Sequence, residues 1–269
     1  MPRVDPADLA GVLAAALGGD AGPLRAFLTA HSHLPGPRGN LELAWQFADA
    51  MRGLATSDAA DAAWHVAAGL ASIGADEAPV DDPGEFLAFC GTVASAALAA
   101  DSARRPAVWE VIRRAAEDPR WRLREAAAQA IQRALPLDPH GTQAVLTGWA
   151  RDGSWLRCRA VVAGLADPPL LHDEALAAEA LALHEVVLAR FTSAPDRHDP
   201  GYRVLRQGLG YTLSVVVAAA PDPGFALLRG LAEKNDRDLA WVLRSNLGKG
   251  RLARAHPAEV EAVRSLMGS

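Results

Sequence analysis

The chain has 269 residues, of which 50% are hydrophobic, 22% charged and 6% aromatic, with a formal net charge of −5 at pH 7. This composition excludes a disordered chain, which would be less apolar, and a disulfide-stapled scaffold, because there are only two cysteines. No apolar run approaches the roughly 20 residues that a membrane-spanning helix needs. With isolated thiols and no recognisable signal peptide, we expect a globular cytoplasmic protein that makes no membrane contact.

Alanine content and apolar spacing both predict helices. The sequence contains 58 alanines, and alanine is the strongest helix former. Apolar residues recur at helical spacing, as in the series Leu176, Ala180, Leu183, Val187 and Phe191. No stretch shows the sustained alternation that is typical of strands. We therefore predict an all-α fold.

Breaks that contain proline or glycine divide the chain into short helices, and 12 to 14 of them would form the fold. In chain order, the predicted helices cover about residues 6–17, 22–32, 39–54, 58–73, 84–100, 105–116, 120–134, 140–151, 153–166, 172–192, 201–219, 223–234, 237–248 and 257–267. The connecting turns are short, so consecutive helices should pack as antiparallel neighbours.

Four segments share one arrangement: an aspartate, then an aromatic residue, then an aliphatic residue followed by arginine. They run from Asp118 to Arg124, from Asp152 to Arg157, from Asp199 to Arg206 and from Asp238 to Arg244. This arrangement resembles the HEAT family of armadillo-like helical repeats. In that family the aspartate lies in the turn between two helices and the arginine lies on the second helix.

The resemblance implies a single α-solenoid domain over 1–269, in which each helical pair buries its apolar face against the next pair. Within it we expect acidic, irregular helices over 1–83, HEAT-like repeats over 84–250 and a capping helix over 251–269. The four repeat arginines (Arg124, Arg157, Arg206 and Arg244) would form a ladder against turn aspartates of adjacent repeats. Contact with a ligand is the alternative interpretation of these four.

Charge is distributed unevenly along the chain. Residues 1–102 contain 4 basic and 13 acidic residues, whereas residues 103–269 contain 23 basic and 19 acidic residues. The basic residues of the second part are either a solvated surface or a stripe that attracts phosphate or an acidic partner. The candidate binding cations outside the ladder are Arg120, Arg122, Arg159, Arg203, Lys249 and Arg251.

Tryptophan recurs near the start of the second helix of a pair, at Trp121, Trp155 and Trp241. These three side chains either pack between repeats or form an aromatic row on a binding surface.

Recognisable catalytic motifs are absent from the sequence. It contains no metal-ligand spacing, no nucleophile elbow and no nucleotide-binding fingerprint, so we expect no metal and no cofactor. The segments beginning at Trp121 and Trp241 are also similar to the HEAT-like-repeat DNA alkylation-repair glycosylases. That similarity implies a basic concave face for DNA and an aspartate beside the damaged base, for which Asp118 and Asp152 are the candidates.

Two functional hypotheses follow from the sequence. The first is a non-enzymatic binding scaffold that takes a protein or another macromolecule, DNA included, on its concave surface. The alternative is a DNA-binding glycosylase that recognises alkylated bases.

Overall fold

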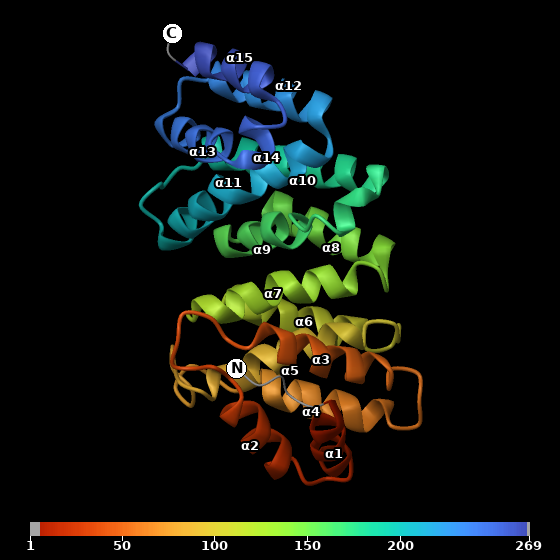
Figure 1. Cartoon of the computed structure of the whole chain (residues 1–269). Helices are drawn as coiled ribbons and strands as arrows, with labels where there is room; N and C mark the ends of the chain where they lie inside the picture. Colours follow the sequence, from red (N-terminus) through yellow and green to blue (C-terminus); the bar gives the residue numbers. More distant parts are fainter. Residues whose placement is uncertain (1–5, 268–269) are drawn as a thin grey trace. The chain divides into compact units, whose positions relative to one another are not determined.

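The structure is a computed structural model that describes residues 6–267. Residues 1–5 and 268–269, which are the outer ends of the segments 1–83 and 251–269 named above, lie outside the described residues. The described residues form fifteen α-helices and one short 3-10 helix, η1, without any strand (Figure 1). The all-α prediction is therefore confirmed.

The helices follow the predicted order closely. They are α1 (Pro6–Leu17), α2 (Gly22–Ala30), α3 (Leu41–Arg52), α4 (Ala60–Ala71), α5 (Glu85–Ala97), α6 (Arg105–Ala116), α7 (Trp121–Ala134), α8 (Pro139–Asp152), α9 (Trp155–Leu165), η1 (Leu170–His172), α10 (Glu174–Thr192), α11 (Pro200–Ala219), α12 (Pro221–Ala232), α13 (Arg237–Leu247), α14 (Gly250–Ala253) and α15 (Pro257–Met267). The sequence analysis missed only η1 and α14, each of which is a single turn.

The chain divides into two compact units, unit 1 (residues 1–142) and unit 2 (residues 143–269). This division lies at a different position from residue 83, where we expect irregular acidic helices to give way to HEAT-like repeats. The helices on both sides of residue 83 belong to unit 1, where they pack against each other around α5. The continuous solenoid stays a prediction.

Unit 1 is organised around α5, a helix in which every residue is buried. Helices α2, α3, α4, α6 and α7 all pack against it. A helix that is covered on all sides must satisfy its polar groups internally. The hydroxyls of Thr92 and Ser95 do so by donating to the carbonyls four residues earlier, Ala88 and Gly91, at 2.8 Å each.

The crossing of α4 and α5 depends on Gly91. A Cβ atom at this position would lie 2.3 Å from the backbone nitrogen of Ala71 and 2.6 Å from the carbonyl oxygen of Ala67. The two helices can approach this closely because residue 91 has no side chain.

Unit 2 stacks the helices that carry three of the four repeat segments. Helix α11 packs against α9, α13 and α14, while α10 packs on α9 and α11. Helix α12 packs on α11, α13 and α15. The helices α9, α11 and α13 are thus consecutive neighbours in one layer.

A fully buried histidine lies in the core of unit 2. His184 of α10 is 0% exposed, and its Nδ1 lies 2.7 Å from the carbonyl oxygen of Ala180. Since a carbonyl only accepts, Nδ1 carries the proton, and Nε2 has no partner among the described residues. Burial lowers the pKa of His184 from its ordinary value of 6.5 to about 4.

Replacement of Gly91 by alanine should destabilise unit 1, because the new methyl group collides with the backbone of α4. We expect Gly91→Ala to lower the free energy of unfolding by about 1–3 kcal/mol, as measured by urea denaturation. Gly69→Ala is the matched control, because a Cβ at Gly69 of α4 meets nothing within 4 Å. That control should raise stability by about 0.5–1 kcal/mol. Equal stability of the two variants would contradict the close crossing.

The stability of unit 2 should depend on pH through His184. Above pH 6.5 the imidazole is neutral in both states and the full stability is present. As the pH falls toward 4, the unfolded state takes up a proton that the folded state cannot, so stability falls by up to about 3 kcal/mol. His184→Leu should remove this contribution, which thermal unfolding between pH 7.5 and 4.5 would measure. A difference between wild type and variant that stays constant with pH would contradict a buried neutral imidazole.

Candidate functional site

Arg120, a predicted binding residue, is buried in unit 1, where its guanidinium group forms hydrogen bonds with other residues of the same unit. It is 2% exposed, and its side chain donates to Asp118 through Nε and Nη2 at 2.9 and 2.8 Å. The remaining donors reach the carbonyls of Ile73, Gly74 and Ala78. All five N–H groups of this guanidinium are therefore used, which corrects its assignment to an exposed binding surface.

Arg122 is also buried rather than exposed. Its Nη1 lies 3.0 Å from Glu85, a carboxylate that is itself 0% exposed. Its Nη2 lies 2.7 Å from Asp81 and donates to the carbonyl of Gly36 at 2.6 Å. A buried charge needs such pairing. Arg122 thus joins three segments of unit 1 and, like Arg120, is a structural residue in this structure.

The two candidate catalytic aspartates lie in different settings. Asp118 is bound by Arg120 and also accepts the backbone N–H of that residue at 2.8 Å. Asp152 is the last residue of α8 and is exposed. The structure does not bring these two carboxylates into one unit. Among the described residues, no group of three or more His, Cys, Asp and Glu side chains could hold a metal ion.

The four repeat arginines do not occupy equivalent positions. Arg206 follows the ladder pattern, because its Nε lies 2.8 Å from Asp238 at the start of the next helix in the layer. Arg124 instead donates to the carbonyls of Asp118 and Pro119 in its own turn. Arg157 is partly buried in α9, and Arg244 is exposed on α13. The aspartates differ too: Asp199 caps α11 and accepts from Gly201 and Tyr202, whereas Asp236, not Asp238, caps α13.

The repeated aromatic residues serve mainly as packing residues in unit 2. Tyr202 is 1% exposed and stacks on Phe191, with 4.4 Å between ring centroids, while Trp155 meets it edge-on at 5.7 Å. Trp241 covers Gly210, where a Cβ would lie 2.7 Å from its ring, and Arg206 lies 4.0 Å from its centroid. In unit 1, Trp121 is 43% exposed beneath Arg122.

The remaining predicted cations come together on the layer formed by α9, α11, α13 and α14. On α11, Arg203, Gln207 and Tyr211 are exposed at a spacing of four residues, which places them in one stripe. Arg159 of α9 lies beside this stripe, because its Cγ is 3.4 Å from the Cβ position of Gly208. We call the following set the basic face: Arg159, Arg203, Tyr211, Lys249 and Arg251.

Tyr211 lies where two cations of the basic face converge. It is 48% exposed, and its hydroxyl lies 3.1 Å from Nη2 of Arg251. The Arg251 guanidinium carbon and the Lys249 Nζ lie 4.9 and 5.6 Å from the ring centroid. The sequence analysis missed Tyr211, although its spacing of eight residues from Arg203 would have placed both on one helical stripe.

Acidic residues are rare within the four helices α9, α11, α13 and α14, and Asp199 and Asp236 cap the N-termini of α11 and α13. Helices α9, α11 and α14 contain no acidic residue, and α13 contains only Asp238, which is engaged by Arg206 and Arg197. Helices α10 and α15, by contrast, contain Glu174, Glu179, Glu185, Glu259 and Glu261. The helices of unit 2 therefore differ in charge among themselves, as the segments of the sequence do.

The position of Tyr211 is fixed by Asn246, whose side chain inserts between α13 and α11. Its Oδ1 accepts the backbone N–H of Ser214 at 2.7 Å, and its Nδ2 donates to the carbonyls of Leu209 and Val242 at 2.8 and 2.7 Å. Ser214 and Leu209 are five residues apart, whereas an α-helix joins groups four apart. The 0% exposed amide thus supplements the hydrogen bonds of α11 on both sides of Tyr211.

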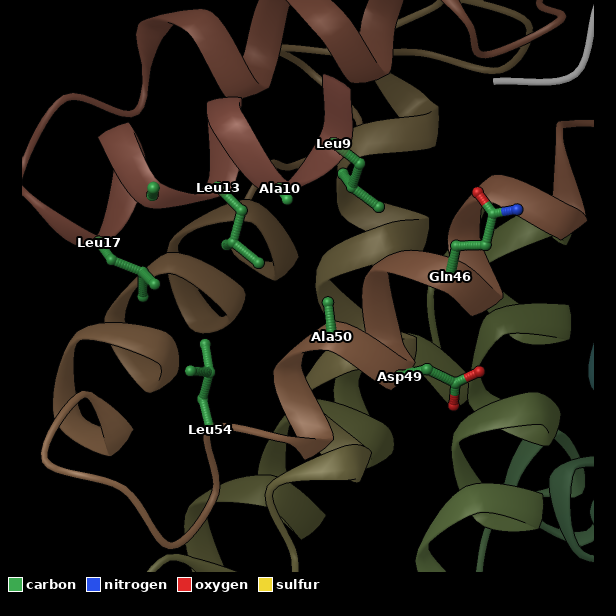
Figure 2. Close-up of a pocket in the computed structure, with 9 residues that line it drawn as sticks. Leu9, Ala10, Leu13, Leu17, Gln46, Asp49, Ala50 and Leu54 are labelled. Atoms are coloured by element: carbon green, nitrogen blue, oxygen red, sulfur yellow. The ribbon is translucent and has the colours of Figure 1, made fainter. Parts of the chain in front are cut away.

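Unit 1 contains a separate aliphatic cavity of about 400 Å³ between α1 and α3. Figure 2 shows Leu9, Leu13 and Leu17 of α1 lining it opposite Leu54, with Gln46 and Asp49 at one side. Asp49 is engaged by Arg133 at 2.8 Å. The lining offers little polar chemistry to orient a ligand, so the basic face is the stronger candidate site.

Loss of the Asn246 amide should destabilise unit 2. In Asn246→Leu, the buried Ser214 N–H and Leu209 carbonyl lose their side-chain partner, at a cost of about 2–3 kcal/mol in the free energy of unfolding. Gln207→Ala on the exposed stripe of α11 is the control and should change stability by less than about 0.5 kcal/mol. Chemical denaturation would compare the two variants. A cost for Asn246→Leu no larger than that of the control would show that the amide is dispensable.

None of the described helices is long and apolar enough to cross a membrane. Comparison with known proteins gives no match to a family model, to a curated protein or to a solved structure.

Proposed function

We propose that this protein is a non-enzymatic helical-repeat binding protein that takes a nucleic acid on the basic face of unit 2. The observation that carries the proposal is the segregation of charge. The cations come from α9, α11 and the segment from Lys249 to Arg251; Arg203 is exposed and the other three are partly exposed. The one acidic side chain of α9, α11, α13 and α14, that of Asp238, is already paired with Arg206. A surface of this kind attracts a polymer of phosphates more strongly than the net charge of −5 suggests.

An acidic protein is the competing partner for a basic surface. Protein interfaces have cores that are depleted in charge and built around apolar anchors. The basic face has arginine and lysine in those places and a single exposed aromatic residue, Tyr211. Contacts of arginine and lysine with successive phosphates account for this composition better, because phosphate binding needs cations without an apolar centre.

The arrangement of the aspartates favours binding without catalysis. A glycosylase of the type suggested by the sequence would place a carboxylate beside the extruded base. Asp118 is occupied by Arg120, and Asp152 lies exposed at a helix end. Release of an alkylated base is therefore not part of the proposal, and its detection on methylated DNA would contradict the non-enzymatic assignment.

The binding of labelled 20-nucleotide DNA, single-stranded and duplex, tests the proposal by fluorescence anisotropy. We expect affinity at 50 mM salt that falls steeply toward 200 mM, because bound cations release counterions from the phosphates. The triple variant Arg203→Gln/Lys249→Gln/Arg251→Gln should lose at least about tenfold in affinity and show a shallower salt dependence.

A matched triple variant in unit 1 controls for net charge. Arg38→Gln/Arg52→Gln/Arg114→Gln removes the same charge from exposed positions and should leave the affinity nearly unchanged. Equal losses in the two triple variants, or no binding by wild type at 50 mM salt, would refute a specific role for the basic face.

A further inference from the structure

We infer that Tyr211 is a stacking platform for an unpaired base, so that the basic face binds single-stranded nucleic acid in preference to duplex. This inference rests on the proposed function and names the form of nucleic acid that the same site takes. It is carried by the geometry around the Tyr211 ring.

Tyr211 is the aromatic residue of the basic face with an open ring surface. Trp241 lies against Gly210 beneath Arg206, and Trp155 lies against Tyr202 with Arg190 at 5.2 Å from its ring. Both tryptophans are thus used for packing between helices. Tyr211 is 48% exposed, although it sits between the buried residues Gly210 and Thr212 of a long helix. A large aromatic side chain kept at the surface of a basic layer suits contact with a ligand.

Two cations lie beside the partly exposed ring of Tyr211. Lys249 and Arg251 come from one short segment and approach the ring, while 48% of the residue stays exposed. A base can stack on the rest of the exposed ring while its phosphate meets the ammonium and guanidinium groups. A nucleotide presents this combination, a flat π-surface one sugar away from a negative charge.

The backbone around Tyr211 holds the platform rigid. Asn246 bonds to Leu209 and Ser214 on either side of it, and the Tyr211 hydroxyl meets Arg251. Little conformational freedom is then lost when a base stacks on the ring. The bases of a duplex are stacked on one another and cannot offer a π-face to a side chain without being unpaired. The platform therefore adds affinity for a single strand and adds none for a duplex.

The test compares four 20-nucleotide ligands by anisotropy: oligo(dT), oligo(U), a DNA duplex and an abasic single strand of the same length. Wild type should bind oligo(dT) or oligo(U) about tenfold or more tightly than the abasic strand. Tyr211→Leu should lose most of that preference and should change the affinity for the duplex and the abasic strand less than twofold. Tyr211→Phe keeps the ring and should stay within about threefold of wild type for every ligand.

The outcomes separate this inference from the proposed function. If wild type binds the abasic strand as tightly as oligo(dT), or if Tyr211→Leu weakens all four ligands equally, the stacking platform is refuted while nucleic-acid binding stands. If wild type binds none of the four ligands, both proposals fail.

Discussion

The close approach of α13 to α11 is the constraint on which the surface of unit 2 depends. Gly210 leaves space for the ring of Trp241, and Asn246 then reaches the backbone of α11. A side chain at residue 210 would push the two helices apart and withdraw the amide from its partners. Because this contact fixes the rotation of α11, it also decides that Arg203, Gln207 and Tyr211 face the solvent.

The local charge of each surface of unit 2, and not the net charge of the chain, decides what that surface attracts. The acidic residues of α10 and α15 lower the net charge, but they lie outside the helices that carry Arg159, Arg203 and Arg251. At physiological salt, charges more than about 8 Å apart at a surface are largely screened from each other. A phosphate that approaches the basic face therefore responds to the local cations, while carboxylates elsewhere keep the net charge of the chain negative.

The sequence predicts the elements well and the side-chain environments poorly. Helix boundaries follow from proline, glycine and capping residues, which act over a few positions; Asp173 and Asn40, for example, cap the helices that follow them. Whether an arginine is exposed depends on residues far along the chain. The sequence around Arg120 and Arg122 is rich in charged residues, which is typical of an exposed surface. In the structure, both side chains are bound by residues 36, 73–78, 81, 85 and 118. No local pattern reveals such partners, whereas the exposure of Arg203 agrees with its place on the helical stripe of α11.

The hydrogen bond from Arg122 to Gly36 also constrains the order in which the parts of unit 1 can fold. The two residues are 86 positions apart, and the loop that contains Gly36 lies before α3. During synthesis from the N-terminus, the first four helices can form while that loop still lacks its anchor and Glu85 still lacks its counter-charge. The residues before position 83 therefore share hydrogen bonds and ion pairs with α7, and a chain that ends before α7 would lack the cation that pairs with Glu85.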